Sequence, residues 1–140
     1  MNNKSGVVAS LLGALLENFE SLRYYVELIY LIVFGKADIK SADIEQRLEE
    51  LRTTLDVFEK SLFVILDYLK ARGNFDKNDP DIRNLELLYG AIRDLRDYQN
   101  IKPIGIVWLK RRFGMTSREN SIFYKSILNM IAKLQKPIIA

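Results

Sequence analysis

The feature of the sequence that most constrains the fold is a pair of long apolar stripes with helical spacing. The first stripe lies within residues 5–34 and advances in steps of three and four, through Leu12, Leu15, Phe19, Leu22, Val26, Ile29 and Val33. The second lies within residues 41–72 and keeps the same steps, through Ile44, Leu48, Leu51, Leu55, Phe58, Leu62, Ile65 and Leu69. Because this spacing puts apolar side chains on one face of an α-helix, each segment is predicted to form one long amphipathic helix.

A short connection joins the two predicted helices. Gly35 is a typical helix stop and Ser41 a typical N-cap, so the helices are expected to fold back on each other as an antiparallel hairpin with coiled-coil-like packing. A helix over residues 41–72 would be about 48 Å long, against a diameter of roughly 37 Å for a compact chain of this length. The protein is therefore expected either to be elongated or to cover the projecting seam with a second copy, as a symmetric homodimer.

Three shorter helices are predicted to follow. An Asp-Pro pair at residues 79–80 opens a helix that ends near Tyr98, and a second helix covers residues 103–113. Thr116 and Glu119 form a capping box that opens the last helix, which ends before the final proline. No segment alternates with a period of two for long enough to predict a strand.

The whole chain, residues 1–140, is therefore predicted to be one all-α domain. It would consist of the long antiparallel helical hairpin, a third helix and a C-terminal pair of helices. With 140 residues, a 49% hydrophobic fraction and only ten Gly and Pro residues together, the chain is long and apolar enough to bury one core.

Composition excludes much familiar chemistry. The chain has no cysteine and no histidine, so disulfides, thiolate catalysis and the usual zinc ligand and general base are all excluded. It also lacks a glycine-rich phosphate-binding motif. We therefore expect a protein that is not an enzyme, that needs no metal or other cofactor, and for which no small-molecule substrate is evident. Charged residues interrupt every apolar run and no cleavage site follows the first, so we expect no membrane span and a cytoplasmic location.

Charge is distributed unevenly along the sequence. Residues 1–99 hold 13 Lys and Arg against 17 Asp and Glu, whereas residues 100–140 hold 8 against 1. This asymmetry is typical of chains with a polyanionic partner, either DNA or RNA or an anionic membrane surface. The acidic part of the chain is an alternative partner for the basic tail, within one molecule or between molecules.

The basic tail also resembles a helix-turn-helix motif. With Gly114 at the turn, apolar residues occupy the positions where that motif requires them, at Leu109, Phe113, Met115 and Phe123, whereas Lys110 and Asn120 depart from the pattern. The resemblance implies that four residues begin a recognition helix facing base edges, namely Ser117, Arg118, Asn120 and Ser121. Phosphate contacts are expected from the cations Lys110, Arg111, Arg112 and Lys125, and the cationic face of the last helix adds Lys133 and Lys136.

Aromatic residues lie among these cations. Trp108, Phe123 and Tyr124 either stack on unpaired bases or pack in the core, and the cations themselves are alternatively an ordinary solvated helix face. The leading hypothesis is a small non-enzymatic nucleic-acid-binding protein, such as a regulator or a replication accessory, that forms a homodimer. The alternative is a helical adaptor or assembly subunit that binds proteins without nucleic acid. Binding of the last helix to a membrane surface is a third hypothesis.

Overall fold

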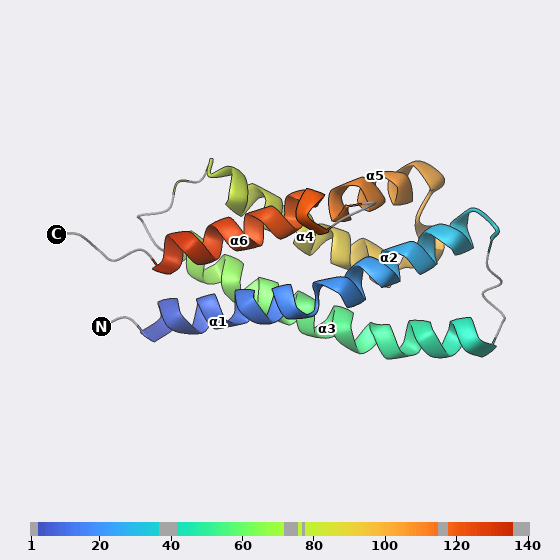
Figure 1. The fold of residues 1–140 in the computed structure, drawn as a ribbon, viewed down its shortest axis with the longest axis horizontal. Helices are drawn as coiled ribbons and strands as arrows, with labels where there is room; N and C mark the ends of the chain where they lie inside the picture. The colour runs from blue at the N-terminus through green and yellow to red at the C-terminus, as the bar shows by residue number, and fades with distance from the viewer. Residues whose placement is uncertain (1–2, 37–41, 72–75, 77, 115–117, 136–140) are drawn as a thin grey trace.

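The computed structural model describes residues 3–36, 42–71, 76, 78–114 and 118–135 (Figure 1). These residues form six α-helices and two short 3₁₀ turns, with no strand among them, which confirms the all-α prediction. The elements are α1 (Asn3–Glu17), α2 (Phe19–Val33), α3 (Ala42–Ala71), α4 (Pro80–Arg96), η1 (Tyr98–Asn100), α5 (Pro103–Phe113), η2 (Arg118–Asn120) and α6 (Ile122–Gln135).

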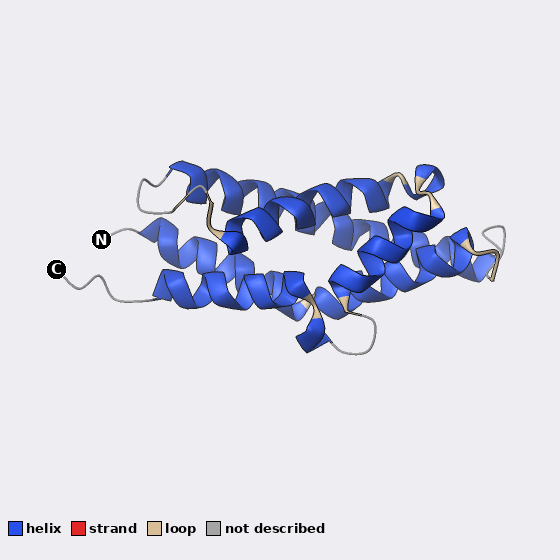
Figure 2. Cartoon of the chain, turned by 90° about the horizontal axis from the view of Figure 1, so that it is seen from above, coloured by secondary structure: helices blue, strands red, loops and turns tan. Residues whose placement is uncertain are grey.

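The helices form an elongated bundle around α3. Helices α1 and α2 follow one another along the molecule, and α3 runs back beside both of them (Figure 1). Helix α4 packs on α3, α6 packs against α1 and α4, and α5 packs against α2. The bundle is much longer than it is wide in both views (Figures 1 and 2), so elongation accommodates the length of α3.

The first and last helices are neighbours in this bundle. Helix α6 lies beside α1, and the Ser5 hydroxyl donates a hydrogen bond to the carbonyl oxygen of Leu134 at 3.4 Å. The beginning of α1 and the end of α6 therefore lie at the same end of the molecule (Figure 1).

One helix predicted over residues 5–34 is instead two, because the chain breaks at Asn18. This residue leaves the helical conformation with φ −100° and ψ 6°, and its side-chain amide donates to the carbonyl oxygen of Ala14 at 2.9 Å. The backbone N–H of Asn18 donates to the same oxygen at 3.2 Å, so the side chain and the backbone share this acceptor at the break. The apolar stripe continues across it, since Leu15 and Phe19 are both buried.

The two apolar stripes supply a large part of the core, and aromatic rings pack together where α2, α5 and α6 meet. Phe113 packs at a tilt against Phe19 and edge-to-face against Phe123, with ring centroids 5.8 Å and 4.9 Å away, which joins α5 to α2 and α6. The buried Tyr25 hydroxyl donates to the carbonyl oxygen of Leu95 at 3.3 Å. Burial raises the pKa of Tyr25 to about 12, so this hydroxyl stays protonated.

The last helix begins later than predicted. Thr116 lies outside the described residues, Glu119 belongs to the 3₁₀ turn η2, and α6 starts only at Ile122. Ser121 caps it, because its hydroxyl oxygen accepts a hydrogen bond from the backbone N–H of Tyr124 at 3.2 Å. The same hydroxyl donates to the carbonyl oxygen of Arg112 at 2.6 Å, so one side chain joins the start of α6 to the end of α5.

Ser121→Ala is expected to lower the free energy of unfolding by about 2 kcal/mol, because it removes the cap and leaves a part-buried carbonyl without its donor. Urea denaturation followed by circular dichroism measures this loss. The matched control is Asn120→Ala at the preceding, exposed position, which should change the free energy by less than about 0.5 kcal/mol. Equal effects of the two substitutions would contradict the role given to Ser121.

Candidate functional site

Of the cations predicted to bind phosphate, Lys110 binds the acidic part of its own chain instead. Its ammonium lies 3.2 Å from a carboxylate oxygen of Glu27 on α2, and 3.9 Å from the centre of the Tyr30 ring. The Lys110 side chain is only 16% exposed. An ion pair and a cation–π contact thus hold Lys110 between α5 and α2.

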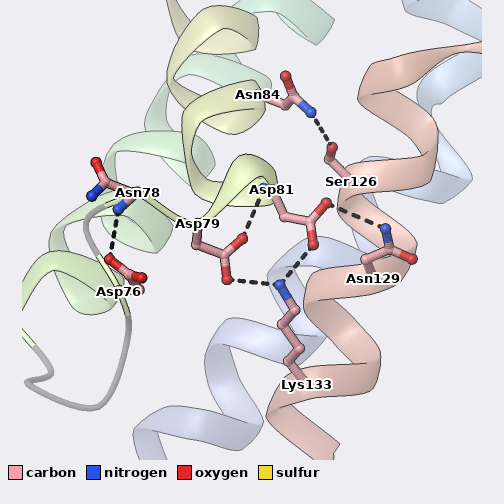
Figure 3. Close-up of polar contacts among 8 residues, drawn as sticks. All are labelled: Asp76, Asn78, Asp79, Asp81, Asn84, Ser126, Asn129 and Lys133. Carbon is pink, nitrogen blue, oxygen red and sulfur yellow. Dashed lines mark hydrogen bonds and ion pairs between the residues drawn. The ribbon is translucent and has the colours of Figure 1, made fainter.

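Lys133 is held in the same way, at the start of α4 (Figure 3). Its ammonium lies 2.7 Å from carboxylate oxygens of both Asp79 and Asp81. Asn129 donates to the second oxygen of Asp81 at 3.2 Å, and one turn further Asn84 donates to the Ser126 hydroxyl at 2.8 Å. We call these six residues, Asp79, Asp81, Asn84, Ser126, Asn129 and Lys133, the α4–α6 clasp.

The charges in the clasp stabilise each other. Burial by itself raises the pKa of Asp79, but hydrogen bonds from the Lys133 ammonium and the Asp81 N–H outweigh it and hold that pKa below its ordinary value of 3.8. Burial likewise lowers the pKa of Lys133, but its hydrogen bonds to Asp79 and Asp81 outweigh this effect and raise the pKa above 10.5. Both groups therefore stay charged at neutral pH.

Two other predicted cations contact aromatic rings. The Arg112 guanidinium lies 3.8 Å from the centre of the Trp108 ring, and its Nε atom is buried without a hydrogen-bond partner. Arg118 lies 5.5 Å from the Tyr124 ring and pairs with Glu119 at 3.4 Å.

The remaining predicted site residues divide into three groups. Ser121 is fully buried, and its hydroxyl is hydrogen-bonded to the carbonyl oxygen of Arg112, so its side chain is not available to base edges in this structure. Arg111, Asn120 and Lys125 are exposed, and neither Arg111 nor Lys125 forms an ion pair within the part of the chain that the structure describes. Ser117 and Lys136 lie outside the described residues. Of the predicted residues that the structure describes, Lys110, Ser121 and Lys133 thus contact other parts of the chain, whereas Arg111, Asn120 and Lys125 face outward.

A different feature, the outer face of α5, stands out. The inner face of this helix is buried through Ile106, Leu109 and Phe113. On the outer face Ile104 is 81% exposed and Trp108 is 39% exposed, and the exposed Arg111 follows one turn later. Their spacing of i, i+4 and i+7 places these three side chains in one line along the helix. We call Ile104, Trp108 and Arg111 the α5 ridge.

Sequence reasoning missed this ridge for a physical reason. Nearly every position of the segment Pro103–Leu109 is apolar, so no helical period distinguishes its buried face from its exposed face. Trp108 was considered either a core residue or a base-stacking residue; it is not fully buried, whereas Phe123 is. The exposure of Ile104 had no signal in the sequence.

A cavity of about 310 Å³ adjoins the ridge between the end of α4 and α5. It is lined by Asp94, Asp97, Asn100, Ile101, Lys102, Gly105, Trp108 and Leu109. The side chain of Asn100 donates to a carboxylate oxygen of Asp97 at 2.7 Å, which orients that carboxylate. Among the described residues, neither Asp94 nor Asp97 has an ion-pair partner. The cavity therefore combines an aromatic wall with two carboxylates and one cation, Lys102.

In the described ranges, no group of three or more acidic side chains is arranged to hold a metal ion. None of the described helices is long and apolar enough to cross a membrane. A second, open cavity of about 730 Å³ lies between the first half of α3 and η1, with Tyr25, Glu49, Arg52 and Tyr98 among its lining residues.

Comparison with protein-family models, with curated proteins and with solved structures finds no match to this chain.

The clasp makes stability depend on pH at both extremes. Because the folded-state pKa of Asp79 is lowered, its contribution is present above pH 3.8 and is lost as the pH falls through the folded-state value. Because the folded-state pKa of Lys133 is raised, the contribution of Lys133 to stability is present below pH 10.5. It is lost as the pH rises through the folded-state pKa. We expect urea denaturation to give a plateau of stability between about pH 5 and about pH 9.

Lys133→Met should lower that plateau by about 1 kcal/mol, a modest value because the Lys133 side chain is 35% exposed. The deficit should shrink as the pH falls below 3.8 and through the lowered folded-state pKa of Asp79, because a protonated Asp79 no longer pairs with Lys133 in the native protein. Lys125→Met on the same helix is the control and should leave stability nearly unchanged. A deficit that is constant with pH would show that the clasp does not act through charge.

Proposed function

We propose that the protein is a non-enzymatic helical adaptor or assembly subunit that binds another protein through the α5 ridge, without nucleic acid. The ridge itself is the observation that carries the proposal. Ile104 and Trp108 lie one turn apart on the exposed side of a helix that buries its other face, and contiguous exposed apolar side chains mark interaction surfaces. Trp and Arg dominate the binding energy of protein interfaces, and helix faces are commonly recognised through side chains at i, i+4 and i+7.

The tail's charge also supports this proposal. Lys110 and Lys133 pair with acids contributed by the first part of the chain, Glu27, Asp79 and Asp81. Contacts between residues 1–99 and residues 100–140 of one molecule thus account for part of the uneven charge. No polyanionic partner is needed to explain Lys110 and Lys133. The buried Phe123, Ile127 and Met130 are likewise used by the core, which leaves that face of α6 unavailable for insertion into a membrane surface.

Nucleic-acid binding is the second candidate function, and one observation favours it. The stacked pair of Arg112 and Trp108 lies beside the exposed Arg111, a combination that holds unpaired bases and phosphates in single-strand binders. Lys125 adds a further exposed cation on α6. Under this proposal these residues, rather than all the predicted ones, would contact the ligand.

Self-association as a homodimer belongs to the proposed function as well, because it would bury exposed apolar side chains in a protein interface. We also propose the cytoplasm as its location, since a chain without cysteine needs no oxidising compartment for folding.

Fluorescence anisotropy with single- and double-stranded oligonucleotides separates the two functions. We expect no salt-dependent binding from an adaptor. A nucleic-acid binder that neutralises about five phosphates would instead show a slope of log affinity against log salt near −4.5. Arg111→Gln combined with Lys125→Gln should then reduce the steepness by about 1.8. These two exposed cations are preferable to Lys110 and Arg112, whose reversal would also disturb the fold.

Affinity capture on the immobilised full chain tests the ridge directly. The native chain should retain at least one protein that is lost with Ile104→Ser combined with Trp108→Ser, because the apolar anchors are gone. The control is Phe63→Ser on α3, which alters a side chain that is 62% exposed but lies outside the ridge. Circular dichroism checks that each variant is folded. If all three proteins retain the same set, the ridge is not the binding surface.

A further inference from the structure

The α5 ridge and its neighbouring cavity form a surface with three parts in a fixed order. The cavity that Asp94 and Asp97 line extends from Ile101, just before α5, to Leu109, Ile104 and Trp108 lie on the outer face of the helix, and Arg111 lies one turn beyond Trp108. Trp108 belongs to both the ridge and the cavity wall, so the parts are continuous. Ile104 and Arg111 are about 10 Å apart along the helix axis, given a rise of 1.5 Å per residue.

This order is self-complementary when a second copy is placed in antiparallel orientation. Consider a two-fold axis that lies in the interface between the two copies, perpendicular to α5. Along the helix it is level with the midpoint between Ile104 and Trp108. This axis places Ile104 of each copy opposite Trp108 of the other copy. It also brings Arg111 to the height of residue 101 on the other copy, beside the cavity that Asp97 lines. The Ile104–Trp108 contact and the approach of Arg111 to Asp97 therefore each occur twice, once on either side of the two-fold axis, as an isologous interface requires.

We infer that the partner of the α5 ridge is a second copy of this chain, docked antiparallel so that two Ile104–Trp108 contacts form the centre and two Arg111–Asp97 ion pairs flank them. The inference rests on the proposed function, which it makes specific by naming the partner. Burying the Ile104 and Trp108 side chains supplies the attraction, and the ion pairs set the orientation.

The charges at the edge of the interface are consistent with this pairing. Lys102 also lines the cavity, but it is one cation against the two carboxylates of Asp94 and Asp97, so the cavity keeps a net negative charge toward Arg111. The surface is small, since one eleven-residue helix carries its centre. It therefore belongs with the smallest specific interfaces, and the dimer should dissociate on dilution.

Sedimentation equilibrium over a concentration series tests the pairing with the full chain. The native chain should show a monomer–dimer equilibrium, and Trp108→Ala should weaken it by about thirtyfold or more, the loss typical of a central aromatic anchor. Phe63→Ala on α3 should leave the dimerisation constant unchanged. A native chain that stays monomeric throughout, or a dimer weakened by Phe63→Ala and not by Trp108→Ala, would overturn the inference.

Charge exchange tests the orientation. Arg111→Asp and Asp97→Arg should each weaken dimerisation several-fold, because each places like charges opposite one another. The double variant Arg111→Asp with Asp97→Arg should recover most of the native affinity, since it restores both pairs with their signs reversed. Failure of the double variant to recover any affinity contradicts the antiparallel arrangement.

Because the chain has no cysteine, disulfide trapping gives an independent readout. A mixture of the Ile104→Cys and Trp108→Cys variants should form the mixed covalent dimer on oxidation, in excess of the product from Ile104→Cys alone, because only the mixed pair lies at the same height. The opposite preference would show parallel pairing and refute the inference.

The failures of the two proposals are distinguishable. If the chain is monomeric but another protein is still captured in a ridge-dependent manner, the self-docking inference fails and the adaptor function stands. If neither self-association nor ridge-dependent capture occurs, both fail.

Discussion

The packing of three helices on one long helix is the interaction on which the rest of the structure depends. Helix α3 presents a continuous buried stripe, and α1, α2 and α4 all lie against it. Single large-to-small changes at fully buried members of that stripe, such as Phe58 or Leu62, would leave cavities costing about 2 to 5 kcal/mol. Helices α5 and α6 have few such contacts with α3 and are held by the helices that it positions. The α5 ridge thus lies on a helix that packs mainly on α2 and is connected to α3 through it.

Much of the fold could be predicted from the sequence because apolar periodicity reports burial directly. The stripe on α3 and the Asp79–Pro80 start of α4 are examples, and the Asp79 carboxylate does accept a hydrogen bond from the Asp81 N–H at 2.8 Å. The break at Asn18 could not be predicted, since it lies on the solvent side and leaves the stripe in register. The predicted start of α6, with Thr116 as its cap, was also wrong. Ser121 is the cap, and its hydroxyl is held by a hydrogen bond to Arg112 on another helix.

The candidate site was less predictable than the fold. Charge counts show how many cations a segment has, but not which carboxylates the fold brings to them. Lys110 meets Glu27 from 83 residues away, and Lys133 meets Asp79 from 54 residues away. The same uneven charge that suggested an external polyanion therefore also serves as attraction between parts of one chain. What remains at the surface is smaller and more apolar, and its composition is closer to that of a protein interface than to that of a phosphate-binding groove.

The contact between the first and last helices has a practical consequence. Since α1 begins and α6 ends at the same end of the bundle, a short linker between the termini would allow the chain to be opened elsewhere, which makes circular permutation feasible. The same geometry suits fusion and surface tethering, because α1 begins and α6 ends at the opposite end of the long axis from the beginning of α5 (Figure 1). A fluorescent or solid-phase anchor at either terminus would therefore leave α5 facing outward.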